Sequence, residues 1–181
     1  DILKRLDNGR LKPFARIVIE TTGLADPAPV LHTIMYHPYL MLRFRLQGII
    51  TVVDAVNGAA TLDHHIEAVK QVAVADRIVL TKGDIATPAA RQGNTKAITE
   101  RLARLAPFAT LIDASDAKAG NLFDTGLWNP ETKHPDVSKW LNAEAHAVEH
   151  DHHGHAHGHH HHDINRHDIN RHDASIRAFC L

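Results

Sequence analysis

Four short runs of β-branched and aliphatic residues alternate with longer helical segments, and this alternation limits the folds open to the chain. The runs are RIVIE (Arg16–Glu20), GIITVVD (Gly48–Asp54), RIVLTK (Arg77–Lys82) and ATLIDAS (Ala109–Ser115). Each is apolar almost throughout, as is typical of strands covered on both faces. Helical patterns at residues 27–44, 60–76 and 87–107 separate the runs. We therefore predict an α/β fold with a mainly parallel sheet and flanking helices.

The composition excludes several classes of protein. A chain of 181 residues, 44% hydrophobic and 23% charged, is long enough for one core. A net charge of -1 argues against a nucleic-acid or membrane-surface partner. No apolar run reaches the roughly 18 residues of a membrane span. The single cysteine, Cys180, rules out an internal disulfide and favours a cytoplasmic protein.

The third run continues into Thr81-Lys82-Gly83-Asp84, which resembles the guanine-binding motif [NT]KxD of GTP-binding proteins. Asp84 would accept hydrogen bonds from the ring N–H and the exocyclic amine of guanine, which adenine cannot supply. The aliphatic stem of Lys82 would lie against the purine, and Thr81 would tie the loop to neighbouring backbone. Four residues are a weak signal, because Lys-Gly-Asp is also a good turn.

The first run ends in Glu20-Thr21-Thr22-Gly23. In P-loop nucleotide-binding proteins an acid that ends a strand holds Mg²⁺, usually through water, and a glycine three residues later faces the terminal phosphate. Glu20 and Gly23 have that spacing, although a polar residue and a glycine also end an ordinary strand. We expect Glu20 and Asp84 to share one rim of the sheet, because parallel strands carry ligands at their carboxyl ends. Asp54 ends another run, where it either reaches this site or forms a turn.

Together these segments resemble the CobW family of metallochaperone GTPases, which are linked to cobalamin synthesis, nitrile hydratase activation and zinc homeostasis. The matching segments are VIETTGLADP, GIITVVDAVNG, EAVKQVAVADRIVLTKGD and a histidine-rich insert before RAFCL. The resemblance implies a P-loop GTPase-like fold that binds and hydrolyses GTP with Mg²⁺ and delivers a transition metal to a client metalloprotein. It places Glu20 and Gly23 at Mg²⁺ and the γ-phosphate, Thr81, Lys82 and Asp84 at guanine, and backbone groups of Ala114 and Ser115 near the base.

Two family motifs are missing from the chain. No GxxxxGK[ST] phosphate loop and no CxCC metal motif occur in the sequence. We expect both to lie before Asp1, and most of the C-terminal domain to follow Leu181. The expected organisation is part of a GTPase domain at 1–128, a linker with a histidine-rich loop at 129–172, and the start of a truncated domain at 173–181. Such a fragment is expected to be inactive alone.

Twelve of the 17 histidines lie between positions 146 and 172. Neutral imidazole binds Zn²⁺, Co²⁺ and Ni²⁺, and closely spaced histidines on a pliable loop would hold several exchangeable ions. The expected ligands are His150, His152, His153, His155, His157, His159, His160, His161 and His162. Zinc or cobalt is the expected metal, with nickel also possible. A purification tag and a solvated linker without a metal role are the plainer interpretations.

Three functional hypotheses follow from the sequence. The leading one is a GTPase that couples nucleotide state to metal delivery. The second is a metal-binding or storage module whose nucleotide site is vestigial. The third is a regulatory GTP-binding protein whose histidines are an incidental linker.

Overall fold

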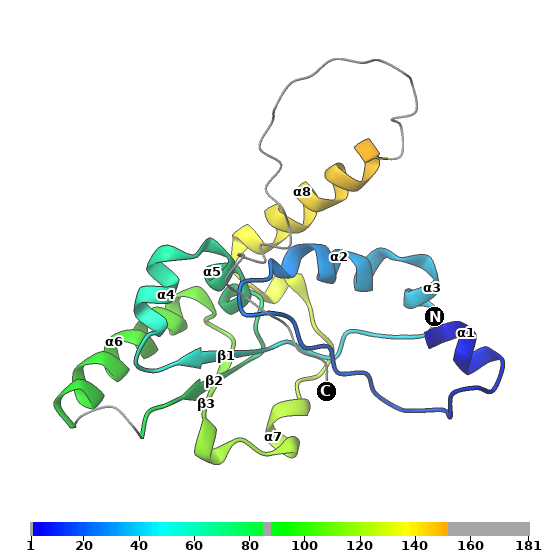
Figure 1. The fold of residues 1–181 in the computed structure, drawn as a ribbon. Helices are drawn as coiled ribbons and strands as arrows, with labels where there is room; N and C mark the ends of the chain where they lie inside the picture. Colours follow the sequence, from blue (N-terminus) through cyan, green and yellow to red (C-terminus); the bar gives the residue numbers. More distant parts are fainter. Residues whose placement is uncertain (1, 85–87, 152–181) are drawn as a thin grey trace, which may run out of the picture.

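The computed structural model describes residues 2–84 and 88–151. Within them, β1 (Ile50–Asp54), β2 (Arg77–Thr81) and β3 (Thr110–Asp113) form a parallel sheet in the order β1-β2-β3 (Figure 1). Val52 is paired with Val79, and Val79 with Ile112. The expected parallel sheet with flanking helices is therefore confirmed.

The helices before and between the strands follow the predicted alternation. They are α1 (Ile2–Asp7), α2 (Pro27–Tyr36), α3 (Pro38–Met41), α4 (Gly58–His64), α5 (Ile66–Ala73) and α6 (Pro88–Leu105). After β3 come η1 (Ala114–Asp116), α7 (Ala119–Phe123), η2 (Pro130–Thr132) and α8 (Pro135–Asp151).

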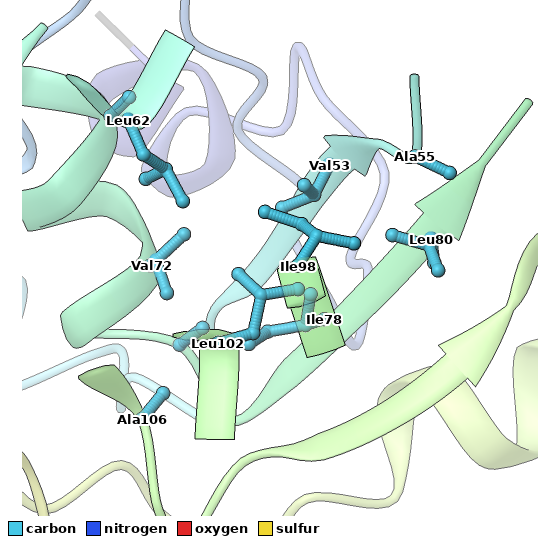
Figure 2. Packing of buried hydrophobic residues seen from close by; sticks show 11 residues of the cluster. Val53, Ala55, Leu62, Val72, Ile78, Leu80, Ile98, Leu102 and Ala106 are labelled. Carbon is cyan, nitrogen blue, oxygen red and sulfur yellow. The ribbon is translucent and has the colours of Figure 1, made fainter. Parts of the chain in front are cut away.

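The main core lies between one face of the sheet and the helices α4, α5 and α6 (Figure 2). Residues paired in a parallel register point to the same face, so Val53 and Leu80 enter this core together with Ile78. Val72, Ile98 and Leu102 meet them from the helices. These side chains lie at helical spacing on α5 and α6, and their burial supplies most of the driving force that holds the helices on the sheet.

A second apolar cluster joins α2 to α8. Leu31 of α2, Val137 and Leu141 of α8 and Trp128 are buried together. The Trp128 Nε1–H donates to the Val74 carbonyl at 2.8 Å, so its polar atom is satisfied inside the cluster. The structure therefore has a helix, Pro135–Asp151, packed through Val137 and Leu141, at the start of the segment 129–172 that was expected to be a linker with a histidine-rich loop. Residues 152–181, with most of the histidine loop and the expected final domain, lie outside the described residues.

The prediction of a first strand at Arg16–Glu20 is wrong for the described structure. This segment has no regular secondary structure, and Val18 and Ile19 are 70% and 58% exposed. A β-branched run provides only a propensity, and a strand forms when a neighbour completes the hydrogen-bond ladder. The residues that surround 16–20 in the described structure supply no such ladder, so the run stays exposed.

Two predicted helices are each divided in two. Helix α2 ends before His37, which is extended (φ -73°, ψ 119°) because Pro38 disfavours a helical conformation in the preceding residue. His65, with φ -129° and ψ 111°, separates α4 from α5. Asp26 begins α2 by accepting a hydrogen bond from the Ala28 amide at 2.9 Å, and Pro27 occupies the first turn.

Candidate functional site

The carboxyl ends of the strands bring three polar segments to one edge of the sheet. Asp54 ends β1 and is paired in register with Thr81, the last residue of β2. Asp113 ends β3 and is paired with Leu80. The loop Thr81–Asp84 therefore leaves the sheet between two carboxylates. Parallel α/β sheets bind ligands at this edge.

Thr81 fastens the start of the loop to β1. Its Oγ1 donates to the Val53 carbonyl at 3.2 Å, and its own carbonyl accepts from the Ala55 amide at 2.9 Å. These bonds extend the β1–β2 ladder by one step beyond the strand ends. The loop consequently departs from a fixed point, as the sequence analysis expected of Thr81.

Lys82 has a left-handed backbone conformation with φ 62°, the one non-glycine residue at positive φ among those described. This conformation costs an L-residue such as lysine roughly 1–2 kcal/mol. Its side chain extends to β1, where Nζ donates to Asp54 Oδ2 at 2.8 Å. Backbone conformation and ion pair together give Lys82 a defined orientation across the two strand ends.

Asp54 accepts hydrogen bonds at both carboxylate oxygens. Oδ1 accepts from the backbone amides of Val56 (2.7 Å) and Asn57 (3.0 Å), and Oδ2 accepts from Asn57 Nδ2 (3.1 Å) and from Lys82. Partial burial by itself would raise the pKa of Asp54. The bonds from Lys82, from the two amides and from the Asn57 side chain outweigh burial and hold this pKa well below its usual value. Asp54 is therefore ionised, and it both forms a turn and binds Lys82.

The end of β3 forms a compact turn beside the same loop. Asp113 Oδ1 accepts from the Ser115 amide at 2.9 Å and from its hydroxyl at 2.7 Å, and these bonds lower the pKa of Asp113. The Ala114 carbonyl accepts from Ala117. A β-carbon added at Gly83 would lie 3.8 Å from Asp113 Oδ2, so the two loops are neighbours. The backbone groups expected to meet a base are thus engaged within their own turn.

The predicted base-binding residues gather at this edge, and Asp84 ends the loop with an exposed side chain. Gly23 is held elsewhere. Its carbonyl accepts from Gln71 Nε2 at 3.1 Å, and the Gln71 carbonyl accepts from Thr51 Oγ1 at 2.6 Å. Gly23 is therefore tied to α5 through the Gln71 side chain, and the exposed Glu20 precedes it on a segment without regular secondary structure.

Two contributors to this arrangement were not assigned by sequence reasoning. Asn57 fixes the Asp54 carboxylate, and Gln71 holds the loop that carries Gly23 through a second bond to the Ala25 carbonyl at 2.8 Å. An Asp-x-x-Asn spacing after a strand is a readable turn signal for Asn57. Gln71 has no local signal, because it acts on a segment 46 to 48 residues earlier.

The side chains that the structure describes contain no group of three or more His, Cys, Asp or Glu residues placed to hold a metal ion. The expected metal ligands are not among them. His150 lies in α8, of which only the backbone is described at that point, and the ligands from His152 to His162 lie outside the described residues. In residues 2–84 and 88–151, moreover, none of the helices has the length and apolar character needed to cross a membrane.

Residues 1–110 match the family described as CobW/HypB/UreG, nucleotide-binding domain. The zinc chaperone YjiA of Escherichia coli strain K12 is 41% identical over 128 residues, which cover 69% of this chain and 38% of YjiA. Zinc-regulated GTPase metalloprotein activator 1 of Schizosaccharomyces pombe is 38% identical over 73 residues, which cover 40% of this chain and 18% of the activator.

Among solved structures, Zn(II)-bound YjiA GTPase from E. coli matches with a TM-score of 0.61 and 39% identity, over 71% of this chain and 39% of YjiA. A Zn(II)-bound triple mutant of the same GTPase matches with a TM-score of 0.60. The chain thus spans less than two fifths of the length of the curated relatives it matches.

Proposed function

Because this chain belongs to the CobW/HypB/UreG nucleotide-binding family, as its motifs predicted, we propose that it supplies the guanine-binding part of a GTP-hydrolysing metallochaperone that handles zinc. The observation that carries the proposal is the loop Thr81–Asp84, which leaves the carboxyl edge of a parallel sheet with its first two residues fixed to β1. The names of the relatives support both a GTPase activity and zinc as the metal.

Asp84 is the proposed selector of the base. Its carboxylate can accept from guanine N1–H and from the exocyclic amine, whereas adenine offers an unprotonated N1 and no amine at C2. The aliphatic stem of Lys82 provides an apolar surface for the purine. A nucleotide with the wrong base would leave the carboxylate without its partners, which is costly once the site has closed over it.

The test replaces one of the two hydrogen-bond acceptors of Asp84 by a donor. Asp84→Asn in the full-length protein presents one acceptor and one donor, which match the N1–H and the C2 carbonyl of xanthine. Asparagine keeps the acceptor for guanine N1–H but turns an N–H donor toward the exocyclic amine, so we expect GDP binding to weaken by roughly 5- to 150-fold, from one lost bond of about 1–3 kcal/mol, and XDP binding to strengthen. Isothermal titration with GDP, XDP and ADP measures this.

The matched control is Asp63→Asn on α4, which makes the same chemical change at the ion pair with Arg101 of α6 and should leave the preference for GDP intact. Equal affinity of the unaltered protein for ADP and GDP, or an unchanged base preference in Asp84→Asn, would contradict the assignment.

Mg²⁺ and the phosphates form a separate part of the proposal. Glu20 is an exposed carboxylate, and an oxygen ligand of this kind is suited to Mg²⁺ held through water. The Gly23 carbonyl accepts from the Gln71 side chain on α5. The loop Thr81–Asp84 is fixed to β1, whereas Glu20 lies on a segment without regular secondary structure, so the described residues support the guanine part of the proposal more than the phosphate part. Since the sequence has no GxxxxGK[ST] loop, we propose that these 181 residues alone hydrolyse GTP poorly.

The metal is the proposed cargo, and the histidines from His150 to His162 are its proposed ligands. Alternating imidazoles with intervening glycines suit rapid exchange of Zn²⁺ better than a closed site with four fixed ligands. The same ligands would also accept Co²⁺ and Ni²⁺, so the choice of zinc depends on the relatives. The proposed recipient is a client metalloprotein in the cytoplasm.

Deletion of residues 150–162 tests the cargo site. We expect the deletion to lower the number of Zn²⁺ ions bound per chain at pH 7.5, and the unaltered protein to lose these ions below about pH 6.5, where imidazole is protonated. Equilibrium dialysis with elemental analysis measures both. Replacement of the same residues by a Gly/Ser segment of equal length controls for the loss of chain length, and an unchanged zinc stoichiometry would contradict the proposal.

A further inference from the structure

Lys82 is fixed at both ends. Its backbone is held in a left-handed conformation immediately after β2, and its ammonium group is bound to Asp54 at the end of β1. The four-carbon stem between these points must span the gap between the two strand ends. The side chain remains 54% exposed despite this anchoring, so a face of the stem is open to a ligand.

The anchor on β1 is rigid in its own right. Three hydrogen bonds from the turn at Val56 and Asn57 orient the Asp54 carboxylate independently of Lys82. Of the four hydrogen bonds to the Asp54 carboxylate, only the one from Lys82 Nζ comes from the loop Thr81–Asp84. The turn thus places the negative charge of Asp54 where it can bind the Lys82 ammonium group.

We propose that Asp54 is a positioning residue for guanine recognition, which holds Lys82 so that its aliphatic stem forms a preformed surface for the purine. This inference rests on the proposed function of the loop Thr81–Asp84. Asp54 acts through Lys82 and makes no contact with the nucleotide.

The advantage of the arrangement is preorganisation. A free lysine must be ordered when a purine binds against it, and the lost side-chain freedom weakens binding. Here the ordering is completed on folding. The ion pair also keeps the ammonium group at Asp54 and away from the nucleotide phosphates. The benefit should therefore be the same for guanosine, GDP and a non-hydrolysable GTP analogue.

Asp54→Asn separates the two roles of Asp54. Asparagine keeps an acceptor oxygen for the Val56 and Asn57 amides and removes the charge that binds Lys82. We expect the variant to bind guanosine, GDP and the GTP analogue about 3- to 10-fold more weakly, equally for all three, as measured by isothermal titration on the full-length protein. Asp63→Asn on α4, which removes the charge partner of Arg101 on α6, should bind all three as the unaltered protein does.

Lys82→Met supplies the second arm, because methionine keeps an apolar stem and leaves every turn bond of Asp54 in place. We expect it to weaken binding to a similar extent, and Asp54→Asn to add less than 2-fold in the Lys82→Met background. A double-mutant cycle of this kind isolates the contribution that passes through the ion pair.

The outcomes distinguish this inference from the proposed function. An unaltered protein that does not prefer GDP to ADP would overturn the guanine site itself. If the preference is present, an Asp54→Asn variant with a lower melting temperature but unchanged guanosine and GDP affinity would show that Asp54 serves only the turn. An equal effect of Asp54→Asn with and without Lys82, or an effect that grows with the number of phosphates, would likewise overturn the positioning role.

Discussion

The base of helix α8 is held to the sheet by an ion pair that is almost fully buried. Lys133, with a side chain 4% exposed, donates to Asp76 Oδ1 and to the Ala75 carbonyl at 3.1 Å. Asp76 is 14% exposed and accepts from the Ile49 amide through its other oxygen at 2.9 Å. The pair connects the segment before α8 to the starts of β1 and β2, and α8 leads directly into the histidine tract.

Lys133→Met should destabilise the protein far more than its conservative volume suggests. Methionine fills a similar space but leaves the Asp76 carboxylate buried with one amide donor. Removal of one partner from a buried ion pair costs about 3–5 kcal/mol. For a domain of 150–250 residues this corresponds to a fall in melting temperature of roughly 6–20 °C.

The matched control is Lys139→Met on α8, which breaks the ion pair with Asp136 (2.7 Å) where the lysine side chain is 76% exposed. An exposed pair contributes about 0–1 kcal/mol and is weakened by salt. Thermal unfolding followed by circular dichroism, at 0.05 and 0.5 M NaCl, compares the two variants. Addition of Asp76→Asn to Lys133→Met should recover part of the loss, because it removes the unpaired charge.

Equal destabilisation by Lys133→Met and Lys139→Met would refute this reasoning, since it would mean that burial does not set the strength of the pair. A further loss on adding Asp76→Asn would also refute it, because the isolated carboxylate would then not be the source of the cost.

Three further predictions concern the core, a close contact and pH. Leu102→Ala should lower the free energy of unfolding by about 2–5 kcal/mol in urea, because this side chain of α6 is fully buried against the sheet, whereas the exposed Leu127 should tolerate alanine within about 0.5 kcal/mol. Gly48→Ala should cost about 1–3 kcal/mol, since the new β-carbon would lie 2.3 Å from Thr125 Oγ1, and urea unfolding again measures it. The lowered pKa of Asp54 stabilises the fold above the unfolded-state value near 3.9, and this contribution is lost as pH falls below it. The stability advantage over Asp54→Asn should therefore shrink between pH 7 and pH 3.

The sequence located the paired strands because two independent signals coincide there. Each of the runs at β1, β2 and β3 combines β-branched residues with a polar turn immediately after it, and helical spacing resumes beyond the turn. The break before Pro38 also had a readable cause in the restricted residue that precedes a proline. His65 divides α4 from α5 without such a residue, so local sequence gave no reason to expect that break.

The run at 16–20 shows the limit of the same reasoning. Its composition matches that of β2, yet β2 has a partner on each side and 16–20 pairs with neither edge of the described sheet. Hydrophobic pattern reports what a segment would gain by burial, whereas pairing depends on which other backbone lies beside it. That information is not contained in five residues.

The candidate site shows the same difference between what local sequence predicts and what depends on distant residues. The loop Thr81–Asp84 was predictable because its proposed role resides in consecutive residues that continue a strand. The partner of Lys82 was not, because the ion pair with Asp54 depends on the register that places Asp54 beside Thr81 across 26 intervening positions. A motif therefore identifies the ligand-facing residues more readily than the residues that hold them in position.

The residues proposed to bind the base and those proposed to face the phosphates are consequently held in place in different ways. The loop Thr81–Asp84 is supported by the paired strands β1 and β2 and by the ion pair between Lys82 and Asp54 at their ends. Its geometry is therefore determined once β1 and β2 are in register. Glu20 and Gly23 lie on a segment without a strand partner in the described sheet, and the Gln71 side chain fastens this segment through the Gly23 and Ala25 carbonyls. A segment fastened by side-chain hydrogen bonds is more readily moved than the paired ladder at β1 and β2. The proposed base-binding loop is thus the preorganised part, and movement of Glu20 relative to Asp84 requires no change in the sheet.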